Sequence, residues 1–400
     1  MPAFFRGSVV LSFLAVGTFL SSLVTSLAYA TPFMMPPPPE INAKGYVLMD
    51  FDSGRIIAAG HEDIRMAPAS LTKIMTAYVA GQEIKGGRLS LDDVVTVSRN
   101  AWSRNFPDSS KMFIEPKDEI SVKNILHGIM VQSGNDASVA LAEHVAGSEE
   151  GFVAMMNSWA ERLGLQDTRF INAHGLDGQD ISTSPTDMAL LARAMIRDVP
   201  EVYKIYGTKS FTWNNIRQFN RNELLWDKSL DVDGMKTGYT SGAGYNLVTS
   251  ATQDGMRLIS VVMGAPSSEI RKVETRKLLT YGFRFYETDT LLDEIEPAVS
   301  EKVWLGKLST INLGIDEDAI LTLPRGQLQN VTVEYQVNGP LKAPVAQGDV
   351  LGAVRWKLGD EVLLERNLLA LDTVESGGLF KRLADSITLF FSSLMGAIAT

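Results

Sequence analysis

The chain has 400 residues, which is more than one compact core usually holds, so two or three domains are expected. Its formal net charge of −10 argues against a nucleic-acid-binding protein, because such a protein needs a basic surface for phosphates. The absence of cysteine excludes cysteine-based catalysis, and four histidines leave little material for a zinc site. The sequence therefore predicts no metal, no cofactor and no nucleic acid as a partner.

The N-terminus has the pattern of an export signal. Arg6 precedes an uncharged apolar run from Val9 to about Val24, and the small-residue pattern Ala28-Tyr29-Ala30 follows. A charged start, an apolar centre and an A-x-A cleavage site are typical of a signal peptide. We predict a signal peptide over residues 1–30 and a Pro-rich leader over residues 31–40, with an uncleaved N-terminal anchor as the alternative.

The next 250 residues alternate between strand and helix patterns. A hairpin is predicted over residues 46–58, because the turn residues Asp52-Ser53-Gly54 separate two apolar runs. Apolar residues at helical spacing then predict a series of helices. These helices cover Pro68 to about Glu83, 121–131, 136–145, 151–163 and 185–198, the last one capped by Ser184 or Thr186.

Strand patterns return after Phe211. Residues 233–238 read as an edge strand, and residues 245–251 and 257–263 flank the turn Gln253-Asp254-Gly255 as a second hairpin. A helix over 269–286 follows. Residues 41–288 are thus predicted to form an α/β (α+β) domain in which helices surround one antiparallel sheet drawn from both ends of the segment.

The C-terminal part is predicted to be a small all-β domain. Short β-type runs at residues 303–305, 319–323, 331–335 and 350–354 are separated by Gly and Pro, as in Pro324-Arg325-Gly326. This spacing is typical of a sandwich, which we assign to residues 296–373.

The last segment, residues 377–400, is expected to be an amphipathic helix. Large apolar residues between Leu379 and Ile398 fall on one face, and charged and small polar residues fall towards the other. Such a helix lies on a membrane surface, and the alternative is docking on the protein's own core. A membrane-spanning helix is disfavoured, because Asp385 leaves an uncharged run of only about 15 residues where about 20 are needed.

Three short motifs with catalytic residue types stand in order along the chain. They are Ser70-Leu71-Thr72-Lys73, Ser133-Gly134-Asn135 and Lys236-Thr237-Gly238. Each is weak alone, since Ser-x-Asn also occurs at Ser98-Arg99-Asn100 and Ser103-Arg104-Asn105. The set gains specificity from its order and its context, because Ser70 opens a helix, Ser133 lies between two helices and Lys236 is on an edge strand.

These residue types fit nucleophilic catalysis. A serine hydroxyl needs a neighbouring base, and Ser70 and Lys73 at positions i and i+3 share one helix face. A lysine acts as a base only if burial or a second cation such as Lys236 lowers its pKa. The backbone N–H of Ser70 and an N–H just after Gly238 are candidates for an oxyanion site, and a side chain at Gly238 would obstruct the approach to Ser70.

The motif set resembles that of the penicillin-binding proteins and serine β-lactamases. The wider sequence is similar to the low-molecular-mass D-alanyl-D-alanine carboxypeptidases of the penicillin-binding protein 5 and 6 type. The resemblance covers nearly the whole mature chain, including the β domain and the tail. It is carried by residues 67–73, 132–137, 221–222, 232–238, 244–248, 281–286 and 320–327.

The resemblance implies a serine β-lactamase/DD-peptidase-like fold and a role for each motif residue. Ser70 would be acylated by the penultimate D-Ala carbonyl of a peptidoglycan stem peptide ending in D-Ala-D-Ala, with Lys73 as the base. Ser133, beside Lys236, would pass a proton to the leaving D-Ala, and Asn135 would hold the peptide.

The resemblance also implies how the substrate's end is held and where the protein works. Thr237 and a cation matched by Arg271 would bind the terminal carboxylate, and β-lactams would acylate Ser70 as covalent inhibitors. The expected location is the periplasmic face of the bacterial inner membrane. Tyr239 departs from the best-known members, which carry a smaller residue or histidine there, and His174 is interpreted as structural.

Three alternatives stay open at this point. A β-lactamase shares the motifs, although no Glu-x-x-Leu-Asn pattern of the class A enzymes occurs between Asn135 and Lys236. A DD-endopeptidase shares them as well. A non-catalytic peptidoglycan-binding protein, active through its β domain, would not need Ser70.

Overall fold

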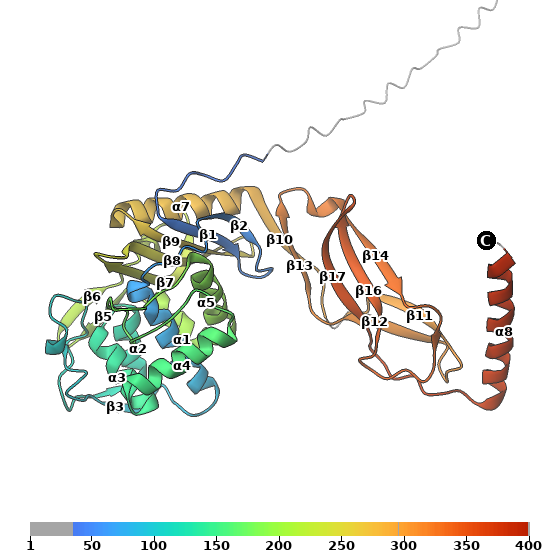
Figure 1. Ribbon diagram of the computed structural model, residues 1–400, viewed down its shortest axis with the longest axis horizontal. Coiled ribbons are helices and arrows are strands. Elements are labelled where there is room, and N and C mark those ends of the chain that lie inside the picture. The colour runs from blue at the N-terminus through green and yellow to red at the C-terminus, as the bar shows by residue number, and fades with distance from the viewer. Residues whose placement is uncertain (1–34, 295, 399–400) are drawn as a thin grey trace, which may run out of the picture. The chain divides into compact units, whose positions relative to one another are not determined.

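The computed structural model describes residues 35–294 and 296–398, with side chains described up to residue 391. The predicted signal peptide lies outside the described residues, and residues 35–44 form no helix or strand. The described chain contains helices around an antiparallel sheet, then an all-β domain and a C-terminal helix (Figure 1). The predicted fold class is therefore confirmed.

The central sheet of the α/β domain combines strands from both ends of the domain, as the sequence predicts. Its order is β2-β1-β9-β8-β7, and all neighbours pair antiparallel, for example Met49 with Ile259. The strands are β1 (Gly45–Asp50), β2 (Ile56–Gly60), β7 (Asp231–Thr240), β8 (Gly244–Gln253) and β9 (Met256–Ala265). Strand β7 lies at the edge of the sheet, so one side of it pairs with no other strand of this sheet.

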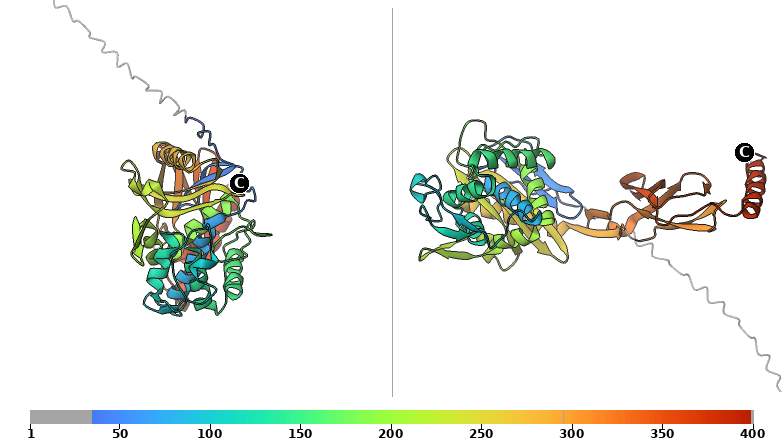
Figure 2. Two further views of the ribbon diagram at one scale, coloured as in Figure 1. Left: turned by 90° about the vertical axis from the view of Figure 1, so that its left-hand side faces the viewer. Right: turned by 90° about the horizontal axis from the view of Figure 1, so that it is seen from below.

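The two faces of the sheet carry two separate apolar cores. Val47 and Met49 belong to the core shared with the N-terminal helices, whereas Leu48 belongs to the core shared with α7 (Ser268–Phe285). This alternation follows from the period of two in a strand. Figures 1 and 2 show α7 on one face of the sheet and the other helices of the α/β domain on the opposite face.

Helix α1 (Thr72–Lys85) runs through the middle of the helical layer and is buried almost all round. It is surrounded by α2 (Val122–Met130), α3 (Asn135–Ala146), α4 (Glu149–Arg162), α5 (Pro185–Asp198) and the short α6 (Pro200–Tyr203). Ser121, Ser148 and Ser184 cap α2, α4 and α5 by accepting a backbone N–H three residues on. Of the two caps proposed for α5, Ser184 is the one observed.

Two small two-stranded sheets were not among the predicted elements. They pair β3 (Val94–Thr96) with β4 (Glu119–Ser121), and β5 (Ser210–Trp213) with β6 (Ile216–Phe219). Strands of three or four residues are too short for a recognisable apolar alternation.

The all-β domain contains a six-stranded sheet in the order β14-β16-β17-β12-β11-β15 and a separate pair, β10 with β13. The strands are β10 (Tyr286–Leu292), β11 (Val299–Trp304), β12 (Thr310–Ile315), β13 (Ala319–Pro324), β14 (Val331–Val337), β15 (Leu341–Lys342), β16 (Val350–Leu358) and β17 (Glu361–Ala370). Strands β10, β12, β15 and β17 were missed by the sequence analysis. In β17 the reason is composition, because Leu and Glu are good helix formers.

A buried polar cluster links the first hairpin to β10 and β13. Asp50 is fully buried and accepts hydrogen bonds from the Ser53 hydroxyl at 2.7 Å and the Thr288 hydroxyl at 2.8 Å. The Thr322 hydroxyl lies 2.6 Å from that of Ser53, and Arg55 donates to the Thr322 carbonyl at 2.6 Å. Each buried polar group in this cluster is thus hydrogen-bonded.

Helix α8 (Leu379–Ile398) has the predicted length. Its described apolar side chains are exposed, among them Leu379, Phe380, Leu383, Ile387, Phe390 and Phe391. Within residues 35–294 and 296–398, no helix is both long and apolar enough to span a membrane.

Candidate active site

The three motifs meet in one cleft of about 680 Å³. Its lining contains Ser70, Ser133, Asn135, Thr237, Gly238, Tyr239 and Arg271, together with Ser109, Ser110, Leu176, Arg221 and Tyr245. A second hollow of about 690 Å³, around residues 227–231 and 252–255, contains none of the motif residues. The motif residues therefore identify the first cleft as the candidate active site.

Ser70 lies in a single 3₁₀ turn, Ala69–Leu71, directly before α1. The sequence predicts a helix from Pro68, whereas α1 begins at Thr72; Ala69 has a positive φ of 50°, which an α-helix does not accept. Lys73 is in the first turn of α1, and its Nζ donates to Ser70 Oγ at 3.1 Å. The contact predicted from the i, i+3 spacing is present.

Lys73 is fully buried and has two further hydrogen-bond acceptors. Its Nζ donates to Asn135 Oδ1 at 2.7 Å and to the backbone oxygen of His174 at 2.5 Å. Burial holds the pKa of Lys73 well below its usual value, with a smaller contribution from the charge of Arg221. A neutral amine has two N–H groups, so when Asn135 and His174 accept both, its lone pair is left to face Ser70 Oγ.

Lys236 and Ser133 form the second polar pair. Ser133 lies in the break between α2 and α3 with a φ of 60°, and its hydroxyl accepts a hydrogen bond from Lys236 Nζ at 2.9 Å. Burial lowers the pKa of Lys236 as well, followed by repulsion from Lys73. Repulsion between the two ammonium groups is mutual, so each lysine disfavours the charged form of the other, and Arg221 adds to this effect on both.

The edge strand β7 brings its motif against the turn that carries Ser70. A Cβ at Gly238 would lie 3.0 Å from the Pro68 oxygen and 3.3 Å from the Leu71 nitrogen. Any side chain at this position would push the strand and the turn apart. The next residue, Tyr239, is 54% exposed and packs on Tyr245 with ring centroids 4.3 Å apart, so it presents an aromatic surface at the mouth of the cleft.

Arg271 comes from α7 on the other side of the sheet and reaches the same cleft. It is 7% exposed and donates to the Asn246 oxygen at 3.2 Å. Burial lowers its pKa to about 10, which leaves it positively charged at neutral pH. A buried cation of this kind suits a carboxylate ligand.

A loop before Asn135 completes the cleft. Asn135 Nδ2 donates to Ser109 Oγ at 3.0 Å, and Arg221 donates to Ser110 Oγ at 2.5 Å. Asp136 is fully buried and accepts from the backbone N–H groups of Met112 at 2.8 Å, Phe113 at 2.9 Å, Ile114 at 3.3 Å and Ala137 at 2.9 Å. The Asp136 carboxylate thereby fixes this loop beside Asn135, the motif residue directly before Asp136.

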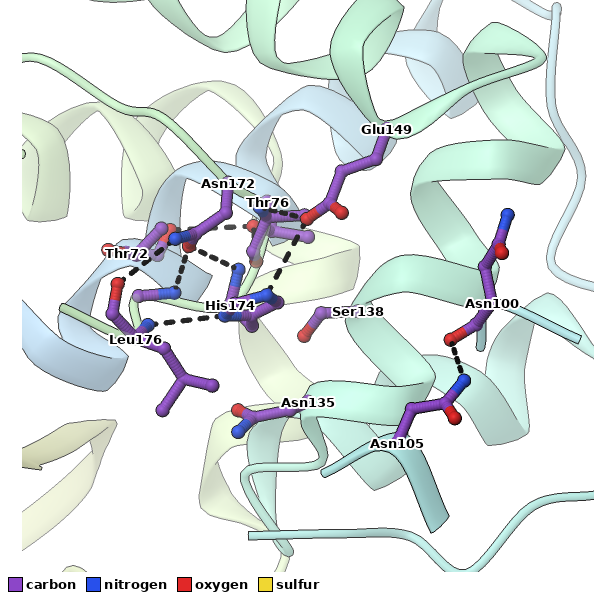
Figure 3. Close-up of polar contacts among 12 residues, drawn as sticks. Thr72, Thr76, Asn100, Asn105, Asn135, Ser138, Glu149, Asn172, His174 and Leu176 are labelled. Atoms are coloured by element: carbon purple, nitrogen blue, oxygen red, sulfur yellow. Dashed lines mark hydrogen bonds and ion pairs between the residues drawn. The ribbon is translucent and has the colours of Figure 1, made fainter. Parts of the chain in front are cut away.

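Arg221, Ser109, Ser110 and Leu176 also line the cleft and were not among the predicted site residues. Arg221 could have been found from the sequence, because the Arg221-Asn222 pair is one of the segments that resemble the family. The two serines lie in a polar loop that no sequence pattern distinguishes. His174 contributes its backbone oxygen to Lys73, and burial and the nearby Lys73 lower the pKa of its imidazole to about 3. The side chain is therefore neutral, and Figure 3 shows it turned towards Glu149.

Comparison with known proteins agrees with this fold. Residues 33–267 match the D-alanyl-D-alanine carboxypeptidase family, and residues 286–376 match the penicillin-binding protein 5 C-terminal domain. The chain is 46% identical to D-alanyl-D-alanine carboxypeptidase DacC of Escherichia coli K12 over 98% of both chains. It is 44% identical to DacA of the same strain, over 96% of this chain and 97% of that one.

A solved structure is similar as well. Penicillin-binding protein 5 from Haemophilus influenzae has a TM-score of 0.82 and 46% identity, covering 85% of this chain and 100% of that one. The fold is thus that of a penicillin-binding protein. The chain belongs to the D-alanyl-D-alanine carboxypeptidase family and is an enzyme of that class. Among the alternatives left open by the sequence, this favours the carboxypeptidase.

Proposed function

We propose that this enzyme removes the terminal D-alanine from peptidoglycan stem peptides through an acyl-enzyme on Ser70. The observation that carries the proposal is the environment of Lys73, a buried amine with a lowered pKa, 3.1 Å from Ser70 Oγ. Lys73 takes the proton as Ser70 Oγ attacks the carbonyl carbon of the penultimate D-Ala. The backbone N–H groups of Ser70 and Tyr239 are the candidate donors to the oxyanion.

Ser133 and Lys236 act on the leaving group in this proposal. The C–N bond breaks as Ser133 passes a proton to the departing D-Ala amine and is reprotonated from the lysine pair, for which the 2.9 Å contact from Lys236 provides a path. Water then hydrolyses the ester and restores Ser70. No cofactor takes part in these steps.

The remaining cleft residues bind the peptide. Asn135 holds the peptide backbone, while Thr237 and Arg271 receive the terminal carboxylate, with Gly238 and Tyr239 lining the approach. The support is their common lining of the cleft and the buried positive charge of Arg271. A β-lactam offers a carbonyl and a carboxylate in similar positions, so it would acylate Ser70 and inhibit the enzyme covalently.

The test measures both reactions on the same protein. Wild-type enzyme incubated with a muramyl pentapeptide ending in D-Ala-D-Ala should release free D-Ala, and mass spectrometry after benzylpenicillin should find the adduct on Ser70. Ser70→Ala should lose both, while Ser103→Ala, in the unrelated Ser-x-Asn motif, should keep both. D-Ala release by Ser70→Ala at the wild-type rate would contradict the proposal.

We further propose that the enzyme is exported and held on the periplasmic face of the inner membrane. The support is the signal pattern over residues 1–30 and the exposed apolar side chains of α8. Deleting residues 379–400 should give a soluble, active enzyme. The double variant Leu383→Asp with Ile387→Asp should also release the enzyme from the membrane, without shortening the chain, whereas Ser386→Asp on the polar face should not. Membrane retention of the deletion variant would contradict the proposal that α8 is an anchor.

The proposed division of the mature chain is a catalytic domain over residues 41–288, a β domain over 296–373 and the anchor helix over 377–400. Residues 41–288 expressed alone should fold and be acylated by benzylpenicillin. An unfolded product would contradict the first boundary.

A further inference from the structure

The carbonyl group that orients Lys73 belongs to a segment without regular secondary structure. Residues 170–181 form neither helix nor strand, yet the His174 oxygen within them makes the shortest of the three hydrogen bonds to Lys73 Nζ, at 2.5 Å. In a helix or a sheet, backbone hydrogen bonds would fix such an oxygen. Here side chains must do so.

Two of these side chains hold the segment locally. Asn172 Oδ1 accepts from the backbone N–H groups of Gly175 at 2.6 Å and His174 at 3.2 Å, and its Nδ2 donates to the Leu176 oxygen at 3.0 Å. Thr76, on α1, donates to the Ala173 oxygen at 2.6 Å. These bonds set the shape of the turn and tie it to the helix that carries Lys73 (Figure 3).

Glu149 holds the segment from the opposite side. It is the first residue of α4, and its Oε1 accepts from the Ala173 N–H at 2.9 Å and lies 3.7 Å from His174 Nε2. His174 Nδ1 accepts from the Leu176 N–H at 3.1 Å, so the neutral imidazole carries its proton on Nε2, the nitrogen nearest Glu149. A single carboxylate oxygen therefore faces both residues that flank the Ala173–His174 peptide bond.

We propose that Glu149 is a positioning residue for the Lys73 base, acting through Ala173 and His174 on the oxygen that fixes the orientation of the Lys73 amine. Glu149 touches neither Ser70 nor Lys73, and no motif of the family set contains it. The inference rests on the proposed role of Lys73 as the base. It assigns to the Glu149 oxygen the task of keeping the lone pair of that base aimed at Ser70.

The test uses variants that separate the hydrogen-bonding oxygen from the charge. Glu149→Ala removes the oxygen, and Glu149→Asp withdraws it by one methylene while keeping the negative charge at the helix N-terminus. Both should lower kcat for D-Ala release and the acylation rate with benzylpenicillin about tenfold, with KM changed less than about twofold, because misplaced catalytic groups affect the chemical step. Glu149→Gln keeps an oxygen at the same reach and should restore the rate to within about threefold of wild type.

Glu150→Ala is the matched control, since Glu150 lies in the same helical turn but is exposed. It should leave both rates at the wild-type level. Rates for Glu149→Ala equal to those of Glu150→Ala would overturn the proposal, as would a Glu149→Gln enzyme as slow as the alanine variant. If Glu149→Ala fails to fold, Glu149→Asp decides the question, and Lys73→Ala tests the base itself independently.

Discussion

Replacing Gly175 by alanine is expected to destabilise the enzyme and slow acylation together. Gly175 follows His174, has a φ of 86°, and a Cβ on it would lie 1.9 Å from the Ala69 oxygen and 2.6 Å from the Ala69 carbonyl carbon. Both are backbone atoms of the turn that carries Ser70, so no side-chain rotation relieves the overlap. The segment with the His174 oxygen must move away from Ser70 and Lys73.

The size of the effect has two parts. A non-glycine residue in the left-handed region costs about 1–2 kcal/mol, and overpacking costs about 1–3 kcal/mol more, which gives about 2–5 kcal/mol in total. Gly147→Ala is the matched control, because Gly147 has a φ of 78° but no atom within 4 Å of its Cβ position. Its free energy of unfolding should fall only by the first contribution, about 1–2 kcal/mol.

Chemical denaturation and thermal melting of both variants provide the assay. The difference of about 1–3 kcal/mol corresponds to roughly 2–12 °C in melting temperature for a domain of this size. Acylation of Gly175→Ala by benzylpenicillin should fall at least about tenfold, because the base loses its orienting acceptor. Equal stability of the two variants, within about 0.5 kcal/mol, would refute the reasoning for the clash.

Three further predictions concern charges and buried polar groups. Acylation by benzylpenicillin should be lost as the pH falls through the pKa of Lys73, because only the neutral amine accepts a proton. Since burial lowers that pKa, the midpoint of the pH profile should lie well below the pKa of free lysine. A stopped-flow pH profile with a midpoint near the free value would contradict this. Asp136→Ala should lower the free energy of unfolding, measured in urea, by about 3 kcal/mol or more, because several buried N–H groups lose their acceptor. Asp136→Asn keeps one acceptor oxygen, so its free energy of unfolding should fall less. Thr322→Val keeps the shape of the side chain but removes a hydroxyl that hydrogen-bonds with both Ser53 and Thr288. The free energy of unfolding should fall by about 1–2 kcal/mol. An unchanged melting curve would show that this cluster adds nothing to stability.

Much of the fold could be read from local patterns. Helices α2, α3, α5 and α7 appear within about two residues of the predicted ranges, because their apolar periodicity is a property of the sequence itself, as are the serine caps of α2, α5 and α7. Strand β17 was missed, since Leu and Glu favour helix locally and only pairing with β16 and β12 makes this segment a strand.

The sequence by itself determined the contact between Ser70 and Lys73, the proposed nucleophile and base, because they lie three residues apart and helical geometry brings them together. It also determined the order of the three motifs and the edge position of Lys236. Only the tertiary structure decided what surrounds the base: the Asn135 and His174 acceptors lie 62 and 101 residues away from Lys73. A lowered lysine pKa and an aimed lone pair depend on burial and on such distant contacts, which no local pattern encodes.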